Sequence, residues 1–166
     1  MSKIVRKVTK AKWNNQLSDD TELNSIISAD AITGCLKTKS NTLSIWKVEK
    51  ENDAILALAS MNDSIVPIDY IVIEEKFFEE NNILVKNIIA ESNPVKELQD
   101  KHYDIQNLDY DSLGKISKEI ASNIVSNKKE YIKRCKALKV KEILLEAISN
   151  DKVKLEDLNE NLQKKL

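Results

Sequence analysis

The order of apolar and polar residues predicts alternating strands and helices over the first two thirds of the chain. Residues 3–8 carry three apolar side chains among bases, which predicts a short edge strand whose charges discourage pairing with another molecule. Residues 21–36 place apolar side chains at helical spacing up to Gly34, which predicts a helix with an irregular exit. Residues 42–48 carry β-forming residues at the positions that face either side of a strand, which predicts an interior strand.

The next segments predict a strand–helix–strand unit. Residues 54–61 are almost wholly apolar and follow a candidate cap at Asn52 or Asp53, which indicates a largely buried helix. Residues 65–73 are apolar and β-branched, with Pro67 near the beginning, as a strand requires. We expect a βαβ unit with a right-handed crossover and parallel pairing of its two strands. The segments that follow are predicted as a helical turn at 74–82, a strand at 83–89, a surface loop at 91–99 and an extended piece at 103–108.

Helical periodicity dominates from residue 109 to the end. The first apolar stripe follows Asp109 and Asp111, either of which is placed to cap a helix. The three predicted stripes are Leu113, Ile116, Ile120 and Ile124, with Val125 as a further candidate; Leu138, Ile143, Leu144, Ala147 and Ile148; and Leu155, Leu158 and Leu162. The predicted fold class is therefore α+β: a small mixed sheet with a βαβ unit in the N-terminal two thirds, followed by a C-terminal helical region. We place a mixed α/β domain at 1–108 and a helical region, packed on it or extending from it, at 109–166.

Length and composition favour one globular body. The chain has 166 residues, of which 42% are hydrophobic, enough to bury one sizeable core. It contains no apolar run of the roughly 18 residues that a membrane span needs, so we expect a cytoplasmic protein with no membrane partner. Cys35 and Cys135 are two isolated cysteines, and we expect both to be free, buried or semi-buried thiols.

Charge divides the chain into three blocks that the overall net charge of −1 conceals. Residues 1–12 hold five bases and no acid, residues 13–110 hold 18 acids and 8 bases, and the remainder holds 13 bases and 9 acids. The last block is concentrated in residues 128–141, where seven bases accompany one acid. Such a partition can steer a charged partner.

Several chemistries are excluded or disfavoured by residue counts. With only Gly34 and Gly114, neither a phosphate-binding P-loop nor a dinucleotide-binding GxGxxG turn can be built. His102 is the only histidine, and three Cys and His residues in all are too few for a tetrahedral structural zinc site. We therefore expect no metal and no cofactor.

Two catalytic arrangements remain open as weaker alternatives. A Cys–His dyad would join Cys35 or Cys135 to His102, but packing thiols and a histidine on a polar loop are the favoured interpretation. A magnesium-dependent nuclease or other hydrolase would use Asp69, Glu74 and Lys76. These acids lie on one strand and directly after its end, whereas such sites normally divide their acids over two neighbouring strands. Solvated acidic residues at the end of a buried strand are therefore the favoured interpretation.

The basic run is the best candidate for a binding surface. On one helix, Lys129, Lys133 and Lys136 would share a face that could follow a phosphate backbone. No base-reading motif accompanies them, and the pI near 6.0 is far from that of a dedicated nucleic-acid binder. A solvated face, or one that docks on the chain's own acidic block, is favoured. The candidate residues for binding nucleic acid or a partner are Lys128, Lys129, Lys133, Arg134 and Lys136.

One stretch resembles a family of small uncharacterised bacterial proteins. The residues that carry this resemblance are Asp30 to Thr33, Leu36, Thr38 and Asn41 to Trp46. The similarity covers about the first 110 residues. It implies a bacterial origin and no particular activity or site.

The leading functional hypothesis is a non-enzymatic accessory or interaction protein of a bacterial operon, for example of the toxin–antitoxin or phage-defence kind. It follows from the missing catalytic motifs and from the charge partition, because complementary patches set the encounter of two proteins. The expected partner is a protein encoded nearby. The alternatives are non-specific nucleic-acid binding through the basic run and a metal-dependent hydrolase.

Overall fold

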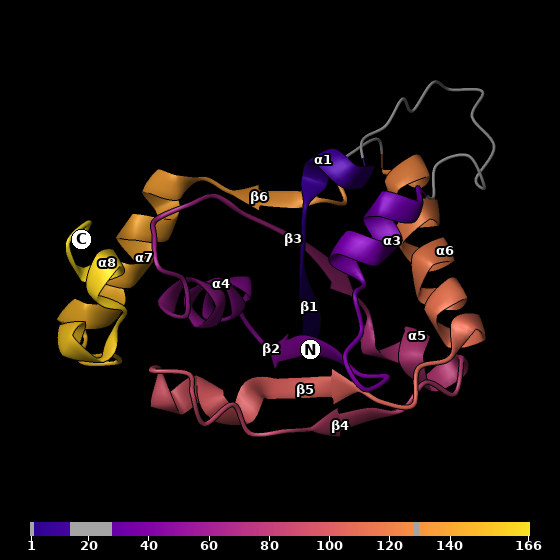
Figure 1. Ribbon diagram of the computed structural model, residues 1–166, viewed down its shortest axis with the longest axis horizontal. Coiled ribbons are helices and arrows are strands. Elements are labelled where there is room, and N and C mark those ends of the chain that lie inside the picture. Colours follow the sequence, from indigo (N-terminus) through magenta and orange to yellow (C-terminus); the bar gives the residue numbers. More distant parts are fainter. Residues whose placement is uncertain (1, 14–27, 128–129) are drawn as a thin grey trace.

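The structure is a computed structural model that describes residues 2–13, 28–127 and 130–166, and a six-stranded sheet forms its centre (Figure 1). The strand order is β4-β5-β2-β1-β3-β6, and each neighbouring pair is antiparallel. The strands are β1 (Lys3–Val8), β2 (Leu43–Val48), β3 (Ile68–Ile73), β4 (Val85–Asn87), β5 (His102–Ile105) and β6 (Lys133–Cys135).

Helices cover both faces of this sheet (Figure 1). On one face α4 (Glu51–Ser60), α7 (Ala137–Ser149) and α8 (Glu160–Gln163) bury one apolar cluster. On the other face α1 (Lys10–Trp13), α3 (Ala29–Cys35), α5 (Glu75–Glu80) and α6 (Tyr110–Ser126) bury a second. Alternation along β1 serves both clusters, since Val5 joins the first and Ile4 the second. The result is a three-layer arrangement with a core on each side of the sheet.

The α+β class and the C-terminal helical region are confirmed, but the expected parallel strand pair is wrong. β2 and β3 run in the same direction on either side of α4, as a βαβ unit requires. They do not pair with each other, because β1 lies between them and is antiparallel to both. The sheet is consequently antiparallel in all its pairings, and not mixed.

β1 is a central strand, so its prediction as an edge strand is also wrong. Its bases are accommodated within the fold instead of repelling neighbours. Lys3 forms an ion pair with Glu51 at 2.7 Å. Arg6 is partly buried and donates hydrogen bonds to the backbone carbonyls of Ser44 and Cys35. Both faces of the strand can then be covered.

Several local predictions are confirmed, and others need correction at their ends. Asp109 caps α6 through a capping box with Ser112. α4 begins at Glu51, before the predicted cap. The predicted loop at 91–99 leads into a 3₁₀ helix, η1 (Lys96–Lys101), and buries Asn93, Val95 and Leu98. The predicted helix at 21–36 begins outside the described residues, and α3 is its described part.

The end of the chain is less continuously helical than its periodicity predicts. β6 interrupts the helical region and pairs with β3. The third predicted stripe forms only a 3₁₀ helix, η2 (Leu155–Asp157), and the single-turn α8, although Leu158 and Leu162 are buried. None of the described helices is long and apolar enough to cross a membrane.

Candidate functional site

The basic run does not form one helical face. Lys128 and Lys129 lie outside the described residues. Lys133 and Arg134 belong to β6, and Lys136 is the residue before α7. Successive residues of a strand point to opposite sides, so Lys133 and Arg134 face different neighbours.

Lys133 is bound to the acidic middle block of the same chain. Its ammonium group lies 2.8 Å from both carboxylate oxygens of Glu51, which also accepts hydrogen bonds from Lys3 at 2.7 Å and from the Tyr70 hydroxyl at 2.9 Å. Partial burial opposes ionisation of Glu51, but these hydrogen bonds outweigh it and hold its pKa at about 2. Two ammonium groups share this one carboxylate, which leaves a local excess of positive charge.

Arg134 is bound to the same acidic block through Asp69. Its guanidinium group makes a bidentate pair with the carboxylate, at 2.6 and 2.9 Å, and the backbone N–H of Lys10 donates a third hydrogen bond at 3.0 Å. The hydrogen bonds from Arg134 hold the pKa of Asp69 below its usual value, against the opposing effect of burial. Asp69 therefore has a structural role in joining β3 to β6.

The residues proposed for a metal-dependent hydrolase are not brought together. Asp69 lies at the beginning of β3 and is engaged by Arg134, whereas Glu74 follows the other end of that strand. Lys76 pairs with Glu80 at 3.0 Å. No group of three or more acidic, histidine or cysteine side chains among the described residues is arranged to hold a metal ion.

The cysteines are placed largely as expected, but the histidine is not. Both cysteines are free and buried, as predicted. Cys35 ends α3 and its sulfur accepts a hydrogen bond from the backbone N–H of Thr9, while Cys135 lies in β6, where burial raises its thiol pKa. His102 begins β5 and is not on a polar loop. Its hydrogen-bond partners in the described structure are Ser44 and Ile88, so the Cys–His dyad is not formed.

The outer face of α7 exposes two leucines. Leu138 is 72% exposed and Leu145 is 42% exposed. They lie seven residues apart and therefore on nearly the same line along the helix, opposite the buried Val140 and Ala147. Leu138 was predicted to be buried, and Val140 takes that position in the core instead. Counting 100° per residue back from Leu144 and Ala147 would have shown this.

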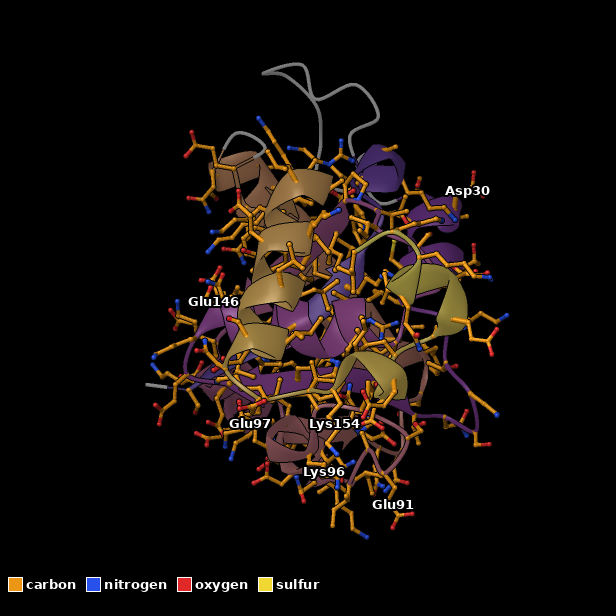
Figure 2. All side chains as sticks on the ribbon, turned by 90° about the vertical axis from the view of Figure 1, so that its left-hand side faces the viewer. Asp30, Glu91, Lys96, Glu97, Glu146 and Lys154 are labelled. Atoms are coloured by element: carbon orange, nitrogen blue, oxygen red, sulfur yellow. The ribbon has the colours of Figure 1, made fainter. Side chains whose placement is uncertain are left out.

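Figure 2 shows the side of the molecule on which α7 lies. α7 lies in the foreground with no other described helix or strand in front of it, and Glu146 projects to one side. Lys136 is exposed at the residue before α7, and it follows Lys133, which shares Glu51 with Lys3, in the sequence. We define the α7 surface as Lys136, Leu138 and Leu145. It combines an apolar stripe with a positively charged end.

Two other lysines of α7 are bound within the chain. Lys139 pairs with Glu142 at 3.1 Å, and the Lys141 ammonium group donates to the Lys165 backbone carbonyl at 2.7 Å. These contacts leave the leucine stripe open while they neutralise part of its border. Lys136 has no ion-pair partner among residues 2–13, 28–127 and 130–166.

Comparison with known proteins identifies no relative of this chain. No protein family, no curated protein and no solved structure matches the chain.

Proposed function

We propose that the chain is an interaction component of a bacterial operon that binds another cytoplasmic protein through the α7 surface. The observation that carries this proposal is the exposure of Leu138 and Leu145 on the side of α7 that faces away from the core. A leucine side chain that passes from water into an interface contributes about 1.5–3 kcal/mol. Two of them on one helical line suit a single elongated partner element.

The chemistry of the surface defines the partner. Leucines seven residues apart match the apolar stripe of an amphipathic helix. The cations at the beginning of α7 favour a partner with acidic residues beside that stripe, since complementary charge fixes register and raises the association rate. We therefore propose an amphipathic acidic helix, on a protein encoded near this chain, as the element that covers α7.

Binding to nucleic acid is less well supported by this geometry than binding to protein. Lys133 and Arg134 already bind carboxylates of the same chain. A phosphate backbone would have to compete with Glu51 and Asp69 for them, which lowers the gain from releasing counterions. An apolar stripe also contributes nothing to phosphate recognition.

The test compares two surface variants in the full-length chain. The chain is co-expressed with the proteins encoded beside it, and complexes are measured by size-exclusion chromatography with light scattering, followed by titration calorimetry. Leu138→Glu combined with Leu145→Glu is expected to weaken the complex at least about 100-fold, because two apolar anchors are replaced by charges that repel an acidic partner. The control is Val125→Glu, which replaces one apolar side chain by glutamate on α6 at a 46% exposed position.

Three results would overturn the proposal. The first is a complex that the two leucine substitutions leave unchanged, and the second is the absence of a complex with any neighbouring protein. The third is a homodimer of the chain alone that the leucine substitutions dissociate, which would make a second copy the occupant of α7. Tight binding of a random-sequence duplex, lost steeply with salt, would favour nucleic acid instead.

A further inference from the structure

Ser44 and His102 form a hydrogen-bonded pair on neighbouring strands. Ser44 lies in β2 and His102 in β5, and the hydroxyl oxygen of Ser44 is in contact with Nε2 of the imidazole ring. Nδ1 lies 2.8 Å from the Ile88 backbone carbonyl, which can only accept a hydrogen bond. Nδ1 therefore carries the proton, and in the neutral ring Nε2 is the acceptor for the Ser44 hydroxyl. A hydroxyl held against a base whose tautomer is set by a third group is the arrangement of an activated nucleophile.

The surroundings hold this pair in place. The Trp46 ring packs edge-on against the His102 ring, with centroids 5.2 Å apart. The Asp104 carboxylate lies 3.8 Å from Nε2, where it would stabilise an imidazolium formed when Ser44 gives up its proton. From the other side of the sheet, Arg6 donates to the Ser44 carbonyl at 2.6 Å and fixes the backbone of the serine.

Both residues open into a cavity with mostly apolar walls. Its volume is about 350 Å³, within the range of small-molecule sites. Met61 and Ile89 at this cavity are 52% and 59% exposed. An apolar group of a few carbon atoms fits this space. The other apolar lining residues are Trp46, Leu58, Ile88 and Ala90.

The same cavity contains a buried donor with nothing to bind. The side-chain amide nitrogen of Asn62 is inaccessible to water and has no hydrogen-bond partner in the described part of the chain. Unpaired buried donors are rare because they cost free energy. Lys7 also lines the cavity, and the register that pairs Val5 with Trp46 places it across from Ser44. Lys7 is thus a donor available to a carbonyl oxygen as it becomes negative, and the unpaired amide of Asn62 supplies a second donor once its side chain turns toward the cavity.

We propose that Ser44 and His102 are a catalytic pair that hydrolyses esters or thioesters with a short apolar acyl group. The Ser44 oxygen bonds to the carbonyl carbon while its proton passes to Nε2 of His102. The bond from that carbon to the leaving oxygen or sulfur then breaks, and Nε2 returns the proton to the leaving group. Water releases the acid by the same steps and restores Ser44.

This activity goes beyond the proposed function and does not depend on it. The cavity is formed by β1, β2, β5, the end of α4 and residues 88–92, with no contribution from α7. Substitutions in the α7 surface should therefore leave hydrolysis unchanged. Failure of partner binding and failure of catalysis can be told apart.

The experiment uses the full chain and a fluorophosphonate probe. Ser44 attacks phosphorus, fluoride leaves, and His102 takes the hydroxyl proton, so a stable adduct records an activated serine. We expect one adduct by intact mass, located at Ser44 by peptide mapping, and loss of that adduct in Ser44→Ala. His102→Gln should slow labelling about 100-fold or more, because the base is removed. Ser64→Ala, at a half-buried serine whose hydroxyl bonds only Asp63 in the described structure, is the control and should label like wild type.

A substrate series gives an independent readout. Acetyl and butyryl p-nitrophenyl esters should be hydrolysed with higher kcat/KM than the decanoyl ester, because the cavity is small. Circular dichroism of each variant confirms folding. The proposal is overturned if the folded wild type forms no adduct, if the adduct lies on another serine, or if His102→Gln labels as fast as wild type.

Discussion

The β6–α7 segment and the Ser44–His102 cavity use polar side chains in opposite ways. In the segment, Lys133 and Arg134 are bound to Glu51 and Asp69 from distant parts of the chain. In the cavity, Ser44 and His102 bind each other and face open space, and the amide nitrogen of Asn62 has no partner among the described residues. The first region is rich in charge and its charges are paired within the chain, whereas the second has fewer charged groups and a buried donor with no described partner.

This difference shows that a region with many charged side chains need not have charged groups free to bind a ligand. A run of bases in a sequence suggests a binding surface. An arginine that is bound bidentately to a carboxylate of the same chain holds two elements together, however, and has few donors left for a ligand. A buried donor without a partner costs stability, so its presence beside a nucleophile–base pair favours a functional role. We therefore expect polar substitutions in the segment to change stability and polar substitutions in the cavity to change activity.

The largest expected effect is on catalysis, from Asn62→Ala. We expect kcat for butyryl ester hydrolysis to fall about 100-fold, the typical result of removing one donor to the developing oxyanion. The free energy of unfolding should stay level or rise slightly, because the variant removes a buried donor that has no described partner. Steady-state kinetics and urea unfolding measure the two quantities.

A second asparagine supplies the control for this prediction. Asn81 bonds the Phe77 carbonyl at the end of α5, and it is not among the residues that line the cavity. Asn81→Ala should leave kcat unchanged. Equal losses of kcat in both variants would mean that Asn62 acts only on the fold.

The next effect is on stability, from Glu51→Gln. Glutamine keeps an acceptor for Tyr70 but removes the negative charge that Lys3 and Lys133 share at the first turn of α4. We expect a loss of about 1–2 kcal/mol at pH 7, a small value because the lysines are partly exposed. Ester hydrolysis should not change. Glu91→Gln, at an exposed glutamate outside the ion pairs of the described structure, is the control for urea unfolding.

The same variant has a defined pH dependence. Glu51 has a pKa of about 2 in the folded protein, below its ordinary value of 4.5. A carboxyl group whose pKa is lower in the folded state stabilises that state above the unfolded pKa, and this contribution is lost as pH falls toward the folded pKa. Wild-type stability should therefore decline from about pH 5 to pH 2 more steeply than that of Glu51→Gln. Parallel profiles would show that Glu51 does not contribute.

Local patterns were sufficient to predict much of the fold. The α6 helix could be predicted from an acidic cap at Asp109 and an apolar stripe at helical spacing, since both signals lie within one segment. The β-branched runs in β2 and β3 identified those strands for the same reason. The order of the strands in the sheet could not be predicted from these local patterns. Bases in β1 suggested an edge because Glu51, which binds Lys3, lies 48 residues away.

The candidate sites escaped prediction for similar reasons. Lysine and arginine are good helix formers, so the sequence predicts a helix for the residues of β6. Pairing with β3 and the contact with Asp69 make them a strand instead. Ser44 and His102 are 58 residues apart and belong to no local motif. Only the pairing of β2 with β5 brings the hydroxyl to the imidazole. The leucine stripe of α7 was within reach of helical periodicity, but Leu138 was assigned to the core in place of Val140.

The smallest expected effect concerns the charged end of the α7 surface. Lys136→Glu should slow association with the acidic partner several-fold and weaken its dependence on ionic strength, because a border charge acts mainly on the encounter of the two proteins. The dissociation rate and the free energy of unfolding should change little, since Lys136 has no ion-pair partner in the described structure. Stopped-flow or surface-plasmon measurements at two salt concentrations resolve the two rates. Lys154→Glu, at an exposed lysine before η2 (Figure 2), is the matched charge reversal and should leave both rates closer to wild type. An equal slowing in both variants would mean that net charge, and not the α7 surface, guides the partner.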